Sequence, residues 1–263
     1  MKIGFFGDSF CARGQEQWNI SWPWVATKYL NKEIKPFCLQ GTHPYLAYKR
    51  LQKHISEVDF VVFVISCPYR FPNDIDLPAA SYGFAEEDFK KLFPGKSEDM
   101  HTMINMYYRL YGEEWHELGT NKVLEKVDNL FKEHNKPALV IPAFEHSLSG
   151  YKFKNATYTE EALRGFWKTF DRMMAVNRNY NQITKTPTYV NHFGPETNYY
   201  LGMVVGRIIK RIQTDPEFKK FEWAKLFIHE DESNEIPIND LKKEYYEILN
   251  HYREKIGFKK FEY

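Results

Sequence analysis

A run of aromatic and β-branched residues, DFVVFVIS at 59–66, constrains the fold of this chain more than any other segment. A strand that is apolar at nearly every position must be covered on both faces, as strands are in a parallel sheet enclosed by helices. Shorter apolar runs precede it at 3–6 and 34–40, and segments with helical periodicity lie between the runs at 22–30 and 43–55. This alternation predicts an α/β domain with a parallel sheet covered by helices on both faces.

The remainder of the chain adds a fourth predicted strand at 137–144 and helices at 159–176 and from Pro195 onward. The segment at about 72–136 is longer than an ordinary crossover between parallel strands and is helical over most of its length. We therefore expect a sheet of four or five strands with a helical insertion, or lid, at about 72–136.

The composition suits one main domain with a full core, because 43% of the 263 residues are hydrophobic. We divide the chain into an α/β domain at 1–215 and a charged C-terminal extension with a terminal helix at 216–263. Lys and Arg number 36 against 35 Asp and Glu, so no overall field attracts nucleic acid or an anionic membrane. The N-terminal apolar run is too short for a signal-peptide core, and no segment approaches a membrane span, so we expect a soluble, cytoplasmic protein.

The cysteines of this chain argue against two ways of stabilising a fold, disulfide bonds and a structural zinc ion. Cys11, Cys38 and Cys67 are odd in number and lack metal-ligand spacing, which argues against a disulfide framework and against a zinc site. All three lie at or near predicted strand ends, and we expect them to be small buried packing residues rather than nucleophiles.

The carboxyl ends of parallel strands meet at one edge of a sheet, where open α/β folds place their chemistry. The predicted strands bring Ser9, Gly41, residues 67–70 and residues 145–146 to this edge. A serine nucleophile needs a base within hydrogen-bond reach and N–H donors for the oxyanion. The alternative for the Gly-Asp-Ser segment is a turn that caps the next helix without a catalytic role.

Among the nine histidines, His192 is the best candidate base, because it lies in a loop immediately before a predicted helix that can hold its imidazole in place. His54, His101, His116 and His134 lie in helical patterns, where a solvated or partly packed face is expected instead.

Five segments together resemble, in order and spacing, the SGNH (GDSL-type) hydrolase superfamily: GDSF at 7–10, SWPWVATKYL at 21–30, the strand leading into Gly41, DFVVFVIS at 59–66, and NHFGPETNYYLG at 191–202. The resemblance covers about residues 1–70 and 186–212. It implies a three-layer α/β/α sandwich with the flavodoxin-like strand order 2-1-3-4-5. It also implies Ser9 as the nucleophile and one oxyanion N–H donor, Gly41 as a second donor, and His192 as the general base.

One departure from the family pattern concerns the oxyanion hole. The family carries an Asn in the turn after the third strand, and the matching segment here, SCPYRFPND at 66–74, has none at that place. Tyr69, Arg70 and Asn73 are the candidate replacements, and Arg70 is the first choice because its charge is permanent and its guanidinium offers a fixed fork of donors.

The other departure concerns the group that orients the base. The family carries an Asp three residues before the histidine, and this position is Tyr189 here. A backbone carbonyl, the adjacent Asn191 or the carboxylate of Glu145 is the candidate orienting group for His192.

These residues predict ester hydrolysis through a Ser-His dyad or an incomplete triad, without a metal or organic cofactor. The resemblance implies a small-molecule or carbohydrate ester as substrate, with carbohydrate O-acetyl groups the first expectation. The alternative is a catalytically inactive SGNH-like domain used for binding or assembly, with 72–136 and 216–263 supplying contact surfaces. The missing Asn and Asp favour this alternative, whereas the intact set of Ser9, Gly41 and His192 favours the enzyme.

Overall fold

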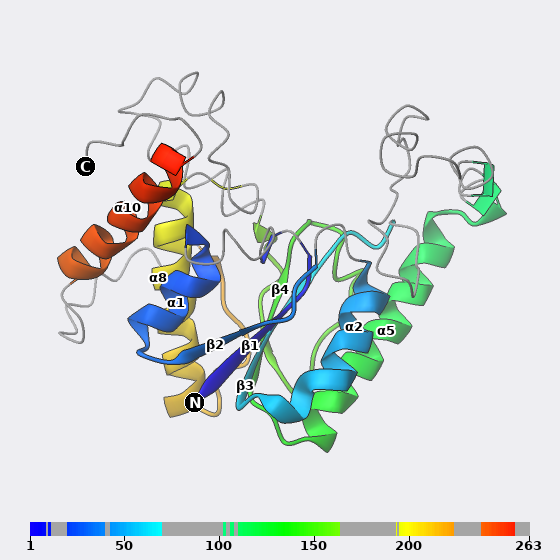
Figure 1. Cartoon of the computed structure of the whole chain (residues 1–263). Coiled ribbons are helices and arrows are strands. Elements are labelled where there is room, and N and C mark those ends of the chain that lie inside the picture. The colour runs from blue at the N-terminus through cyan, green and yellow to red at the C-terminus, as the bar shows by residue number, and fades with distance from the viewer. Residues whose placement is uncertain are drawn as a thin grey trace.

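Five parallel strands form one sheet in the part of the chain that the computed structural model describes (Figure 1). They are β1 (Lys2–Phe6), β2 (Glu33–Pro36), β3 (Phe60–Ile65), β4 (Ala138–Pro142) and β5 (Thr157–Tyr158), in the order β2-β1-β3-β4-β5. The structure describes residues 1–8, 10–11, 20–39, 43–69, 102–103, 106–107, 110–163, 193, 195–223 and 238–255. The predicted α/β class and the flavodoxin-like strand order are confirmed.

Helices cover both faces of this sheet, as Figure 1 shows. The helices α1 (Trp22–Tyr29), α8 (Pro195–Thr214) and α10 (Ile238–Lys255) lie on one side, and α2 (Pro44–His54) and α5 (Glu113–Glu133) lie on the other. Among the described residues, no helix is both long and apolar enough to cross a lipid bilayer.

The strands are apolar on both faces because each face contributes to a different core. Phe5, Val62 and Ile141 point into the cluster shared with α1 and α8. Their sequence neighbours Phe6 and Phe63 belong to the cluster formed with α2 and α5. All six residues of β3 are buried, as its unbroken apolar sequence predicts.

Two strands differ from the sequence-based expectation. β2 is shorter than the predicted strand at 34–40, although its pairing with β1 continues through the amides of Phe37 and Leu39, which donate to the carbonyls of Phe5 and Gly7. β5 was not located in the sequence, because a two-residue strand carries no recognisable periodicity.

The described part of 216–263 packs against the α/β domain. Phe218, Phe221 and Trp223 join the core on the α1 and α8 side. Tyr158 of β5 donates its amide to the carbonyl of Lys219 at 3.0 Å, so this segment runs along the outer edge of the sheet.

The predicted domain boundary at residue 215 stays a prediction. Within the predicted insertion at 72–136, α5 is helical as expected, and most of 70–109 lies outside the described residues.

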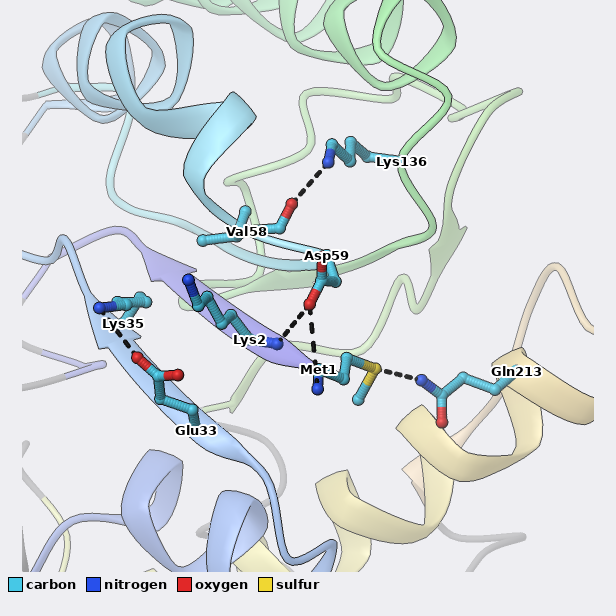
Figure 2. A network of polar contacts seen from close by, with 8 residues as sticks. All are labelled: Met1, Lys2, Glu33, Lys35, Val58, Asp59, Lys136 and Gln213. Carbon is cyan, nitrogen blue, oxygen red and sulfur yellow. Dashed lines mark hydrogen bonds and ion pairs between the residues drawn. The ribbon is translucent and has the colours of Figure 1, made fainter.

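Polar contacts tie together the amino ends of the strands (Figure 2). The carboxylate of Asp59 accepts the amide of Lys2 at 2.7 Å, and the amide of Asp59 donates to the carbonyl of Lys2 at 2.9 Å. Lys136, just before β4, donates to the carbonyl of Val58 at 2.6 Å. These bonds join the starts of β1, β3 and β4, so the amino edge has a structural role.

The helices α1 and α8 approach each other closely because α8 carries glycines one turn apart. A Cβ added to Gly202 would lie 2.7 Å from the carbonyl oxygen of Trp22 and would also overlap Val25. A Cβ at Gly206 would lie 2.6 Å from the ring of Tyr29, a side chain that can move more easily than backbone. Gly202 is therefore the position where α8 tolerates no side chain.

Replacing Gly202 with alanine should lower the free energy of unfolding by about 1–3 kcal/mol, because the overlap with backbone outweighs the better helix propensity of alanine. Gly119 in α5 is the matched control, since a Cβ there would meet no atom within 4 Å. Gly119→Ala should raise the stability by up to about 1 kcal/mol. Urea unfolding followed by circular dichroism measures both, and equal stabilisation of the two variants would contradict the close packing of α1 on α8.

Candidate active site

The turn after β1 is held by its own backbone and by the side chain of Asp8. Gly7 has φ 150°, and a Cβ there would lie 2.7 Å from the carbonyl oxygen of Val64. The fully buried carboxylate of Asp8 accepts the amide of Phe10 at 2.9 Å, and its carbonyl accepts the amide of Cys11 at 3.0 Å. Asp8 therefore shapes the turn, as expected from the alternative in which the Gly-Asp-Ser segment forms a turn without a catalytic role. Ser9 itself lies outside the described residues.

The residue after Ser9 is fixed by the start of α1. The indole N–H of Trp22 donates to the carbonyl of Phe10 at 2.6 Å, and both residues are buried. Ser21 occupies the N-cap of α1 as predicted, but its side chain makes no capping hydrogen bond. Pro23, in the first turn, offers no N–H to cap, and the amide of Trp22 is bound instead by Asn198.

Asn198 of α8 ties the loop before that helix to the start of α1. Its side-chain oxygen accepts the amide of Trp22 at 3.1 Å, and its side-chain amide donates to the carbonyl of Phe193 at 3.1 Å. Asn198 is fully buried. The ring of Phe193 packs edge-on against that of Phe10, with centroids 5.7 Å apart and an interplanar angle of 70°. The two chain segments that carry the predicted nucleophile and base are therefore in contact, while His192 and Asn191 lie outside the described residues.

The chain after β2 stays beside β1 as far as Leu39, whose amide donates to the carbonyl of Gly7 at 3.0 Å. This contact lies two residues before Gly41 in the sequence. Gly41 is outside the described residues, so its predicted role as an oxyanion donor stays a prediction.

The segments after β3 and β4 meet at the same edge of the sheet. The thiol of Cys67 lies 3.5 Å from Nε2 of His146, and the ring of Tyr69 lies 5.0 Å from that imidazole between centroids. The hydroxyl of Tyr69 donates to the carboxylate of Glu117 in α5 at 3.1 Å. Glu145 is exposed. The proposed donor and orienting roles of Tyr69 and Glu145 stay predictions, and Arg70 and Asn73 lie outside the described residues.

The three cysteines have different environments. Cys11 is fully buried, and burial, followed by the neighbouring thiol of Cys38, raises its pKa well above the usual value. Burial also raises the pKa of Cys38. Cys11 agrees with the expected buried packing role, whereas Cys38 is only half-buried and packs against the margin of the same core. Cys67 is half-buried and pairs with His146, a pairing that the sequence analysis missed even though it placed both residues at this edge.

His116 also differs from its expected place on a solvated or partly packed helix face. Its side chain is buried in α5, with its ring near those of Tyr69 and Tyr107. Burial lowers the pKa of His116, so its imidazole is neutral at pH 7. Among the described residues, no group of three or more His, Cys, Asp and Glu side chains is arranged to hold a metal ion.

Replacing Asn198 with alanine should lower the free energy of unfolding by about 2–4 kcal/mol, because it leaves the amide of Trp22 and the carbonyl of Phe193 without these partners in the interior. Chemical denaturation measures the change, and an unaltered stability would contradict the bridging role.

The variant Asn198→Asp separates the two bonds of the bridge. Its carboxylate keeps the acceptor for Trp22 but loses the donor to Phe193, unless the acid is protonated. Burial raises the pKa of such a carboxyl above its unfolded value, so the stability of this variant should be greatest at low pH and fall as the pH rises through the folded-state pKa.

A scan against protein-family models finds no match to the chain, and a search of curated proteins finds none either. Among solved structures, a lipolytic protein of the G-D-S-L family from Desulfitobacterium hafniense DCB-2 is similar at 12% identity and a TM-score of 0.36, covering 79% of this chain and 98% of that one. The lipase/acylhydrolase from Enterococcus faecalis is similar at 17% identity and a TM-score of 0.31, covering 80% of this chain and 95% of that one. The fold assignment above rests on the sheet topology alone.

Proposed function

We propose that this chain is a serine hydrolase that cleaves ester bonds, with Ser9 as nucleophile and His192 as general base. The contact between Phe10 and Phe193, with ring centroids 5.7 Å apart, carries the proposal. These rings are the sequence neighbours of Ser9 and His192, which are 183 positions apart in the chain (192 minus 9). Side chains adjacent to two packed rings can reach hydrogen-bond distance, which a nucleophile and its base require.

In the proposed reaction, His192 takes the proton of the Ser9 hydroxyl as its oxygen attacks the ester carbonyl. The N–H groups of Ser9 and Gly41 stabilise the oxyanion. The bond from Leu39 to Gly7 supports this role of Gly41, because it brings the chain beside the turn after β1. His192 then returns the proton to the leaving alcohol, and water releases the acyl group by the same route in reverse.

The third oxyanion donor is assigned to Arg70, with Asn73 as its alternative. Tyr69 is less suited to this role, because its hydroxyl already donates to Glu117. The guanidinium of Arg70 would bring a permanent charge as well as donors to the oxyanion.

His192 works in this proposal without the usual carboxylate, oriented by a backbone carbonyl, Asn191 or Glu145. Loss of the carboxylate of a complete triad costs up to about 10⁴ in turnover, while the remaining parts still give catalysis above water. The proposed enzyme is therefore slow on generic esters. Short acyl esters, O-acetyl groups of carbohydrates first, are the proposed substrates.

Purified protein should hydrolyse an aryl acetate, and Ser9→Ala and His192→Ala should each reduce kcat by about 10²-fold, because the carboxylate of a complete triad is already missing and losses within a triad do not add. Because the two groups act as a unit, the double variant should lose no more than either single one. Release of the phenol, followed spectrophotometrically across acetate, butyrate and octanoate esters, measures both the loss and the acyl preference.

The controls are Ser56→Ala and His134→Ala, exposed positions at the amino edge of the sheet, and both should keep the parent rate. Turnover that persists in Ser9→Ala would remove Ser9 as the nucleophile. A folded parent with no turnover on any of these esters would instead support the binding or assembly alternative, in which Asp8 holds the turn and the hydroxyl has no chemical role.

Restoring the missing carboxylate should increase activity. Tyr189→Asp places an acid three residues before His192, and the kcat on aryl acetates should rise at least about tenfold, against a ceiling of about 10⁴. Tyr189→Asn matches the size of the new side chain without its charge and should give no such gain. Equal rates in the two variants would show that orientation by a carboxylate is not what limits this site.

A further inference from the structure

We propose that Cys67 and His146 form a second nucleophile–base pair at the carboxyl edge of the sheet, a modification site at which Cys67 reacts with soft carbon electrophiles. The proposal goes beyond the esterase function and does not depend on it. It begins from the distance of 3.5 Å between Sγ of Cys67 and Nε2 of His146, which is a hydrogen bond for a sulfur donor or acceptor.

The sheet places these two residues together. β3 and β4 are neighbouring parallel strands whose last residues, Ile65 and Pro142, face each other in the register. The pairing continues one residue further, where the amide of Ala143 donates to the carbonyl of Ile65 at 2.8 Å. Cys67 and His146 follow two and four residues after these strand ends, so the strand register brings the pair together.

The imidazole is held in position by aromatic rings. The ring of His146 stacks on Phe144, with centroids 5.9 Å apart and an interplanar angle of 15°, and lies 5.0 Å from the ring of Tyr69. Its backbone carbonyl accepts the amide of Ser149 at 3.2 Å. Aromatic faces stabilise an adjacent cation, which favours the protonated imidazole.

Among the described residues, the carboxylates near the pair act in the same direction as the aromatic rings. From α5, Glu117 accepts the hydroxyl of Tyr69 beside His146, and His116 lies beyond the same tyrosine with its pKa lowered by burial. On the segment after β4, Glu145 is exposed next to His146. The carboxylates of Glu117 and Glu145 favour an imidazolium at His146, and neutral His116 does not oppose it.

The other two cysteines provide a comparison for the reactivity of the Cys67 thiol. Burial raises the pKa of both Cys11 and Cys38, so their thiols are protonated and inert at neutral pH. Cys38 and Cys67 are both half-buried, so what sets Cys67 apart from Cys38 is its hydrogen bond to His146, which can take its proton. A thiolate beside an imidazolium is the reactive form of a cysteine.

The reaction conserves atoms and charge. The proton of Cys67 moves to Nε2 of His146, and the thiolate attacks the electrophilic carbon to form a C–S bond. The leaving group departs with the electron pair of its own bond, as iodide does from iodoacetamide. The proton on His146 then passes to solvent, and no oxidant or reductant takes part.

Alkylation of the intact protein by iodoacetamide, followed for each cysteine by peptide mass spectrometry between pH 5 and 9.5, tests the pair. A thiol whose pKa is lowered by about two units has about 50-fold more thiolate at pH 6.5 than a free model thiol, but each thiolate is a weaker nucleophile. Cys67 should therefore react about fivefold faster than the model thiol at this pH. The inflexion point of the alkylation rate of Cys67 as a function of pH should lie well below pH 8.5, the ordinary value for a free thiol. Cys11 and Cys38 should remain almost unmodified in the same sample.

His146→Gln should slow the reaction of Cys67 at pH 6.5 to the rate of the model thiol and return the inflexion to about 8.5. The matched control His134→Gln, at the opposite edge of the sheet, should change neither. A parent rate no faster than the model thiol, or an unchanged profile in folded His146→Gln, would overturn the proposal. Should His146→Gln not fold, the thiolate absorbance of the parent, lost in Cys67→Ser, reports the same inflexion. Because none of these readouts needs ester turnover, failure here is distinguishable from failure of the esterase proposal.

Discussion

The contact between α1 and α8 determines where the proposed active site can lie. Gly202 lets the backbones approach, and Asn198 then binds the amide of Trp22 with one end of its side chain and the carbonyl of Phe193 with the other. The indole of Trp22 in turn binds the carbonyl of Phe10. Three buried hydrogen bonds thus link the turn after β1, the start of α1 and the loop before α8, and the contact of Phe10 with Phe193 follows from them.

The two edges of the sheet have divided roles. At the amino edge, Lys2, Asp59 and Lys136 bind backbone groups across neighbouring strand starts, which fixes the register of the strands (Figure 2). At the carboxyl edge, the ring of Phe10 packs against those of Phe193 and Phe144, and Cys67 lies within hydrogen-bond distance of His146. The first edge thus has a structural role, whereas the candidate reactive groups follow the strands at the second edge, where open α/β folds place their chemistry.

Much of the fold could be predicted from the sequence, because its main signals are local. The unbroken apolar run of β3 and the periodicity of α2 and α8 identify a covered parallel sheet, and its strand order follows from the family resemblance. β5 could not be predicted, since its two residues are selected by pairing with β4 and with Lys219 rather than by a pattern of their own. The bond of Asn198 to Trp22 and the pairing of Cys67 with His146 join residues 176 and 79 positions apart, and only the packing of neighbouring elements brings such residues together.

The outer edge of β2 has a consequence for how copies of this chain can associate. An open edge strand offers unpaired amides and carbonyls to any other strand, and flat apolar edges of this kind lead to aggregation. Here the edge strand is only four residues long, ends in Pro36, which has no N–H, and carries the exposed ion pair of Glu33 and Lys35 at 2.9 Å. At the opposite edge, β5 is already paired with the segment around Lys219. Among the described residues, neither edge of the sheet is therefore suited to pairing with a strand of a second molecule, which leaves the helices and loops as the surfaces for association.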